Sequence, residues 1–213
     1  MHFIFQDSLI VEKKESNING LNYIPSILQE GLNDRDSVFK FKSEPPPLEI
    51  SDCNIFSLEK ILNELVVRNI VEIGVSRNGS RSFTHTLLKR KTKNGIYCGI
   101  DLDDKSYLNN INNNIYTIQT SSYEQTKIRD YLKKIGIKEI DVLFIDGDHS
   151  INTVVNDWKY TDLLSKNSVV ILHDTNHHLG PTLLMDAIDQ SKFAVYKYCQ
   201  LDNDYGLSAA FKL

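Results

Sequence analysis

The sequence predicts an α/β fold, a doubly wound and mostly parallel seven-stranded sheet with an antiparallel last strand. Short runs of β-branched and aromatic residues alternate along the chain with longer segments whose apolar residues recur at helical spacing. The short runs are apolar throughout, which is typical of strands that are buried on both faces. Strands and helices that alternate in this way form a parallel sheet through right-handed crossovers.

The expected elements begin at residue 55. Helices are expected at 55–69, 82–90, 122–136, 151–166 and 181–190. Strands are expected at 69–75, 96–102, 115–120, 140–146, 168–174, 193–198 and 207–213. The Asn-rich residues 108–115 are expected to form a short helix and a loop. The segment that joins the last two strands is too short for a crossover helix, so these strands should pair as a hairpin that makes the final strand antiparallel.

The chain has one predicted boundary. Residues 43–52, SEPPPLEISD, contain consecutive prolines, which favour an extended connector. We therefore expect residues 1–50 to form an N-terminal extension and residues 51–213 to form the domain that contains the sheet. Because specificity must come from outside a shared sheet, the extension is expected to supply a lid or an oligomer contact, which allows for a homo-oligomer.

Composition excludes several classes of partner. The chain of 213 residues has 24 Lys and Arg against 28 Asp and Glu, a net charge of -4, and no basic stripe, so a nucleic-acid partner is not expected. No signal peptide or run of about 18 apolar residues is present, which predicts a cytoplasmic protein without a membrane partner. The three cysteines are widely spaced, so no disulfide or zinc framework is expected, and Cys98 is expected in the core.

Acidic residues lie where the predicted strands end. The first strand ends in Glu72 and Gly74, the second in Asp101, the fourth in Asp146 and the fifth in His173 and Asp174. In open α/β sheets, ligands bind outside the carboxyl ends of the strands, near the point where the strand order reverses. Several strands that carry carboxylates to one edge therefore predict a binding site there.

The stretch EIGVSRNGS indicates which ligand this edge accepts. Gly74 and Gly79 flank a tight turn from strand to helix, but Ser76 stands where the dinucleotide fingerprint has its middle glycine. A pyrophosphate is therefore disfavoured. Asp101 can accept hydrogen bonds from both hydroxyls of a ribose and would repel a 2'-phosphate, so a nucleoside without phosphates fits better.

These motifs resemble those of the class I S-adenosylmethionine-dependent methyltransferases over roughly residues 55 to 213. Glu72, Gly74, Gly79 and Ser80 resemble the first motif of that family, and GIDLD at Asp101 resembles its acidic ribose-binding motif. IDGDHS, then NDW, then ILHDT resemble the subgroup of metal-dependent sugar and macrolide O-methyltransferases and cephalosporin-hydroxylase-like proteins. The resemblance implies S-adenosylmethionine as cofactor. By the same resemblance its binding residues are Glu72 and Gly74 near the methionine moiety, Asp101 at the ribose, Thr120, Ser121 and Ser122 near the adenine, and also Gly79, Ser80 and Asp146.

The resemblance also implies a divalent metal, expected to be Mg²⁺, held by Asp146 and Asp174. Metal-dependent relatives carry Asn or Asp after the second ligand, where this chain has Thr175. Thr175 is therefore the expected third ligand, with Asn176 or a water as alternatives. Oxygen ligands suit magnesium, manganese or calcium better than zinc.

Two residues compete for the role of catalytic base. The expected reaction is O-methylation of a small hydroxylated acceptor such as a sugar or a natural product, in which a bound metal acidifies the hydroxyl and a base removes its proton. His149 stands where catechol-type relatives carry Lys, and Asp148 stands where sugar-type relatives carry Asp. His149 has a pKa suited to neutral pH, whereas the complete IDGDHS string favours Asp148.

Other readings remain open from sequence alone. An NAD-dependent oxidoreductase is consistent with Asp101 but not with Ser76, and a metal-dependent hydrolase would leave the glycine turn without a purpose. A non-catalytic cofactor-binding or scaffold protein of methyltransferase descent is also possible. The adjacent His177 and His178 are expected to be solvated, and Asp157 is expected at the surface or as a helix cap.

Overall fold

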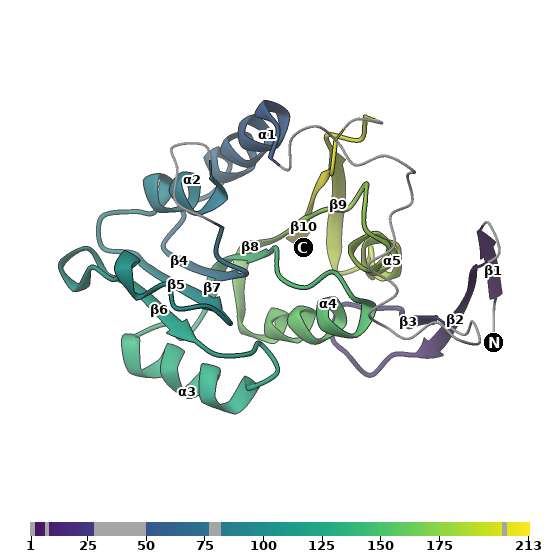
Figure 1. Cartoon of the computed structure of the whole chain (residues 1–213), viewed down its shortest axis with the longest axis horizontal. Coiled ribbons are helices and arrows are strands. Elements are labelled where there is room, and N and C mark those ends of the chain that lie inside the picture. The colour runs from purple at the N-terminus through teal and green to yellow at the C-terminus, as the bar shows by residue number, and fades with distance from the viewer. Residues whose placement is uncertain (1–2, 7–8, 28–49, 77–81, 202–203) are drawn as a thin grey trace.

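The computed structural model describes residues 3–6, 9–27, 50–76, 82–201 and 204–213. A seven-stranded sheet with the order β6-β5-β4-β7-β8-β10-β9 forms the centre of the chain (Figure 1). Its strands are β4 (Asn69–Ile73), β5 (Ile96–Asp101), β6 (Ile115–Gln119), β7 (Ile140–Ile145), β8 (Leu164–His173), β9 (Phe193–Tyr198) and β10 (Leu207–Lys212). Strand β10 is antiparallel to both of its neighbours, and the pairs on the other side of β8 are parallel. The predicted fold class and the antiparallel last strand are therefore confirmed.

Helices cover both faces of the sheet. They are α1 (Asp52–Asn63), α2 (Phe83–Arg90), α3 (Gln125–Ile135), α4 (Ile151–Trp158) and α5 (Leu179–Ala187). Side chains of α1 and α2 pack with Val142 and Phe144 of β7 on one face, and those of α3, α4 and α5 pack with Leu143 and Ile145 on the other. Because successive strand residues point to opposite faces, these apolar strands supply a core to both layers. None of the helices described is long and apolar enough to cross a membrane.

Several boundaries differ from those predicted. Helix α1 begins at residue 52 because Ser51 accepts a hydrogen bond from the backbone N–H of Asn54 and the Asn54 side chain bonds back to Ser51. Helix α4 ends at Trp158 and continues as a 3₁₀ turn (Lys159–Leu163), so β8 begins earlier than expected. Residues 108–115 contain a 3₁₀ turn (Ile111–Asn113) and a loop.

Part of the N-terminal extension forms a small sheet that was not predicted. Strands β1 (Phe3–Gln6), β2 (Leu9–Glu15) and β3 (Tyr23–Ile27) pair antiparallel, and β3 lies beside α4 and α5 (Figure 1). The turn before β3 docks on the main domain, where the Trp158 indole N–H donates to Asn19 O at 3.0 Å. The backbone N–H of Asn22 also donates to Ala187 O at 2.8 Å. The proline connector, up to residue 49, lies outside the described residues.

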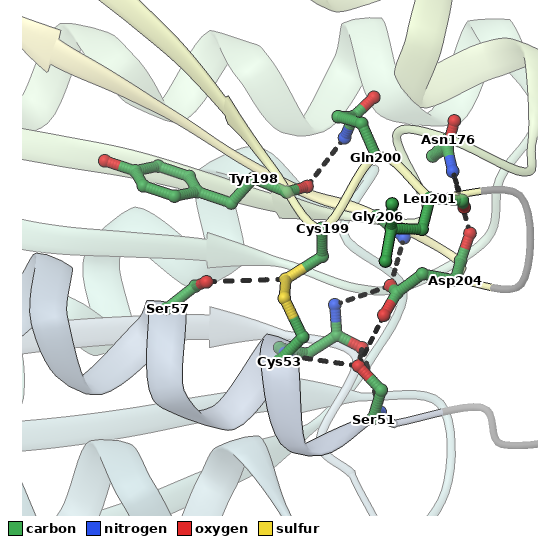
Figure 2. The surroundings of a disulfide bond; sticks show 11 residues. Ser51, Cys53, Ser57, Asn176, Tyr198, Cys199, Gln200, Leu201, Asp204 and Gly206 are labelled. Atoms are coloured by element: carbon green, nitrogen blue, oxygen red, sulfur yellow. Dashed lines mark hydrogen bonds between the residues drawn. A yellow bond between two sulfur atoms is a disulfide. The ribbon is translucent and has the colours of Figure 1, made fainter.

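A disulfide joins Cys53 of α1 to Cys199 after β9, so the expectation of no disulfide is wrong (Figure 2). The two cysteines are 146 residues apart in sequence, with Cα atoms separated by 5.9 Å. The loop after β9 is also held by Asp204, whose carboxylate accepts hydrogen bonds from Ser51 Oγ at 2.5 Å and Asn54 Nδ2 at 2.9 Å. Cys98 is buried and unpaired, as expected.

We expect reduction of this disulfide to lower the free energy of unfolding by roughly 2–5 kcal/mol, because the crosslink closes a long loop in the unfolded chain. Denaturant unfolding with and without reductant measures the change. A Cys53→Ser/Cys199→Ser double variant should match the reduced protein and should not respond to reductant. An equal response in that variant would mean that the effect comes from elsewhere in the chain.

Candidate active site

A cavity of about 1210 Å³ opens at the carboxyl ends of the central parallel strands. The structure brings together there most of the described residues expected from sequence, which are Gly74, Asp101, Thr120, Ser121, Ser122, Asp146, Asp148, His149 and Asp174. His173 also lines the cavity. Gly79 and Ser80 lie outside the described residues. The strand-end pattern therefore located the edge at which polar side chains gather.

The turn after β4 is built around Gly74. Its φ is +80°, and a Cβ there would collide with the backbone carbonyl of Asp146. The N–H of Gly74 donates to Ile100 O at 3.0 Å, and the N–H of Val75 donates to Oδ2 of Asp101 at 2.8 Å. These contacts place the carboxylate of Asp101 beside the turn, at the wall of the cavity.

Glu72 lies behind this wall and does not line the cavity. Its side chain is fully buried on the α2 side of the sheet, where Thr84 Oγ1 donates to it at 2.8 Å and the Tyr97 hydroxyl also donates. Burial raises the pKa of Glu72 to about 8, in spite of both hydrogen bonds. At neutral pH this carboxyl is mostly protonated and acts as an anchor between β4, β5 and α2.

A cluster of carboxylates and imidazoles lies at the ends of β7 and β8. Nδ1 of His173 lies 2.9 Å from Oδ1 of Asp146 and 3.2 Å from Oδ2 of Asp174. Nε2 of His149 lies 2.5 Å from Oδ2 of the same Asp174. His173 is 2% exposed and Asp174 is 3% exposed, so these charges interact with little screening by water.

Each member of the cluster changes the proton affinity of the others. Burial disfavours the charged form of His173, but the carboxylates of Asp174 and Asp146 raise its pKa well above the ordinary value. Burial would raise the pKa of Asp174, but His173 and His149 lower it below its usual range. Burial raises the pKa of Asp146 in spite of His173. At neutral pH these shifts favour a protonated His173 beside an ionised Asp174.

His149 and Asp148 have different surroundings. The ring of His149 stacks on His178 with centroids 4.1 Å apart and an interplanar angle of 2°. Asp148 is exposed, and its Oδ1 accepts a hydrogen bond from the backbone N–H of Ser150 at 2.7 Å, at the start of α4. His149 is thus held in one orientation by a carboxylate and a ring, whereas Asp148 is fixed mainly by a turn.

The side chain of Thr175 is turned away from Asp146. It is 1% exposed, and its hydroxyl lies 2.7 Å from Ser208 Oγ of β10. The amide of Asn176 donates to the backbone carbonyls of Leu201 and Asp204. Of the two side chains expected to complete a metal site, Thr175 therefore contacts β10 and Asn176 holds the loop between β9 and β10.

Histidine side chains lie beside the aspartates for which the sequence predicted only oxygen co-ligands of a metal ion. Donor atoms of Asp146, His173 and Asp174 lie within 4.8 Å of one another, as do those of His149, Asp174 and His178. Such mixed sets fit a divalent ion of the manganese, iron or zinc kind better than magnesium, which prefers oxygen. The sequence signal for a histidine ligand was His173, which directly precedes Asp174 at the end of a predicted strand.

Three expectations about single residues are wrong. His177 and His178 are buried instead of solvated, and the rings of His177 and Tyr205 are 4.4 Å apart. Asp157 is neither on the surface nor a cap, because it is fully buried and lines the cavity. The signal for Asp157 was its place next to Trp158 and one turn after Val154 on an amphipathic helix.

Comparison with known proteins agrees with this architecture. Residues 71–175, which include the strands that carry the cavity, match a family model described as a methyltransferase domain. A search of curated protein sequences finds no match.

Solved structures of low sequence identity share the fold. An O-methyltransferase from Bacillus cereus in complex with S-adenosylhomocysteine has a TM-score of 0.56 and 17% identity over 79% of this chain and 84% of that chain. A putative rRNA methylase from Clostridium thermocellum has a TM-score of 0.55 and 20% identity over 78% and 100%. MycE from the mycinamycin pathway, solved with Mg, S-adenosylhomocysteine and mycinamycin VI, has a TM-score of 0.51 and 14% identity over 74% and 47%, so this chain spans about half its length. The chain therefore has the fold of the class I S-adenosylmethionine-dependent methyltransferases, and its residues 71–175 match a methyltransferase-domain family.

Proposed function

We propose that this protein transfers a methyl group from S-adenosylmethionine to a hydroxyl of a small acceptor, such as a sugar or a natural product. The observation that carries the proposal is the pairing of His149 with Asp174 at the edge of a cavity that also holds Asp101. A hydroxyl attacks a sulfonium methyl group well only when its proton is leaving, so a base must lie at the reacting end. The other end of the cavity offers a carboxylate for a ribose.

His149 is the better placed of the two candidate bases. Its Nε2 faces Asp174, which leaves Nδ1 to accept the proton from the acceptor. The negative charge of Asp174 would stabilise the imidazolium that forms, as the aspartate does in a Ser-His-Asp triad. Asp148 has no such partner among the interactions described and already accepts a hydrogen bond from Ser150.

A divalent cation is part of the proposal. Asp146, His173 and Asp174 would hold it, and when bound it would lower the pKa of the acceptor hydroxyl. The imidazole in this set supports Mn²⁺, Fe²⁺ or Zn²⁺ in place of the Mg²⁺ expected from sequence.

We also propose that residues 1–50 act as a lid or an oligomer contact. Ile50, where the extension meets the main domain, lines the cavity, and the turn before β3 docks on α4 and α5. The extension is thus joined to both the site and the outer surface of the domain.

Calorimetric titration with S-adenosylmethionine, in magnesium and then in chelator, should show binding in both conditions. Asp101→Ala should weaken binding by about 10- to 100-fold, because hydrogen bonds between the ribose and a charged acceptor are lost. Asp104→Ala is the matched control, since that carboxylate is exposed and bonds to Ser106. No binding to the wild-type chain would reject the proposed function, and NADH binding in its place would favour an oxidoreductase.

His149→Gln should lower turnover by about 10²- to 10⁴-fold, the usual contribution of a general base, with little change in cofactor affinity. Asp146→Ala should abolish turnover and also leave cofactor affinity largely intact. Release of S-adenosylhomocysteine with a panel of phenols, catechols and sugars measures the rate. A large loss in Asp148→Asn together with an active His149→Gln would assign the base to Asp148 instead. Cofactor binding without turnover on any acceptor would favour a non-catalytic role.

Metal content tests the donor set without an acceptor. After incubation with equal amounts of Mg²⁺, Mn²⁺ and Zn²⁺ and then dialysis, we expect the wild-type protein to retain Mn²⁺ or Zn²⁺ by elemental analysis. Asp174→Asn and His173→Gln should each lose most of this metal, because both remove a donor. Retention of Mg²⁺ in preference to the other ions would show that oxygen ligands alone determine the site.

A further inference from the structure

Asp157 presents an unused hydrogen-bond acceptor in the wall of the cavity. Its carboxyl belongs to α4 and is fully buried, yet it lines the cavity. Oδ1 accepts a hydrogen bond from Asn156 Nδ2 at 3.3 Å. Among the residues that the structure describes, none donates a hydrogen bond to Oδ2. A buried carboxyl oxygen without a donor costs free energy, so its persistence in a cavity wall points to a donor that a ligand supplies.

Two ligand-facing loops enclose Oδ2 of Asp157. A Cβ built on Gly147, after β7, would lie 3.8 Å from this oxygen. The side chain of Ser122, after β6, interacts with the same carboxyl. The Tyr160 hydroxyl donates to Ser122 O at 2.8 Å, which fixes the loop after β6 against the segment that follows α4. The oxygen is therefore enclosed by the loop after β6 on one side and by Gly147 on the other.

In a nucleoside whose ribose is held by Asp101, the base would lie near Asp157, which lines the same cavity. A ribose held by Asp101 lies at the end of β5, and the reacting methyl group must lie toward Asp146 and His149 at the end of β7. The N–H of Thr120 donates to Asp101 O at 2.8 Å, so the loop after β6 begins directly beside the ribose site. The base then enters the space between that loop and Gly147, next to Asp157.

We propose that Oδ2 of Asp157 accepts a hydrogen bond from the exocyclic amino group of the adenine, and that this contact selects adenine over a base with a carbonyl at the same place. The inference rests on the proposed binding of S-adenosylmethionine. Adenine offers an N–H donor there, whereas hypoxanthine offers an oxygen that would face the carboxyl oxygen. A site built to bond a donor rejects the analogue that lacks it, since its own polar atom is then left unpaired.

The electrostatics of the site agree with an amino donor. Burial raises the pKa of Asp157 to about 7, in spite of Ser122 and Asn156, and the charge of Asp148 adds to the increase. An N–H donor at Oδ2 would stabilise the ionised form of the carboxyl.

The test compares the affinities of S-adenosylhomocysteine and S-inosylhomocysteine, in which a carbonyl replaces the amino group, by calorimetry. We expect the wild-type protein to bind the adenosyl compound at least about tenfold more tightly. Asp157→Asn keeps the shape of the side chain but can donate to the carbonyl, so this preference should disappear or reverse. Asp162→Asn is the matched control, because Asp162 is exposed and pairs with Arg129 away from the cavity.

The outcomes separate this inference from the proposed function. Equal affinity of the wild-type protein for both compounds would overturn the role of Asp157 and leave cofactor binding intact. An unchanged preference in folded Asp157→Asn, or an equal loss of affinity for both compounds, would assign Asp157 a purely structural role. No binding of S-adenosylhomocysteine to the wild-type protein would overturn the proposed function and the inference together. If Asp157→Asn does not fold, equal affinity of the wild-type protein for the two compounds still overturns the inference.

Discussion

The site depends on one close approach of two backbone segments, where the turn at Gly74 passes against the carbonyl of Asp146. This approach requires a residue without a Cβ in the left-handed region, because any side chain would meet the neighbouring strand end. Next to this approach, the N–H of Asp146 also donates to Ile73 O at 2.8 Å, which joins the ends of β7 and β4. Asp101 at the end of β5 and Asp146 after β7 are therefore held at a fixed separation on either side of β4.

The carboxylates and imidazoles at the ends of β7 and β8 also restrict how the site can be arranged, because each charged group needs a partner. Taking several charges out of water costs free energy unless each has partners. His173 contacts both Asp146 and Asp174, and His149 contacts Asp174 as well, so two carboxylates face two imidazoles. The same balance explains why Thr175 can turn toward Ser208, since the cluster does not need its hydroxyl.

Much of the main sheet could be predicted from sequence because parallel strands buried on both faces must be apolar throughout. For the same reason the polar residues that end these strands stand out, and the structure brings Asp101, Asp146 and Asp174 to one cavity. Glu72 follows the same pattern but points to the other face, which alternation along a strand decides. Long-range contacts leave no such local signal: the Cys53–Cys199 disulfide joins distant segments, and the small N-terminal sheet, whose strands pair locally, docks on the distant helices α4 and α5. The burial of His177 and His178 likewise comes from packing with a distant loop at Tyr205.

The place of β10 in the sheet has a consequence for synthesis of the chain. Residues 207–212 insert between β8 and β9, so the sheet on that side is assembled out of chain order (Figure 1). A nascent chain that ends before residue 207 leaves the apolar edge of β8 without a neighbour, and β9 then has no strand to pair with. An open apolar edge is a template for association with other chains. Partly synthesised or truncated chains should therefore be the aggregation-prone species, and protection of β8 by a chaperone would be needed only until the last strand emerges.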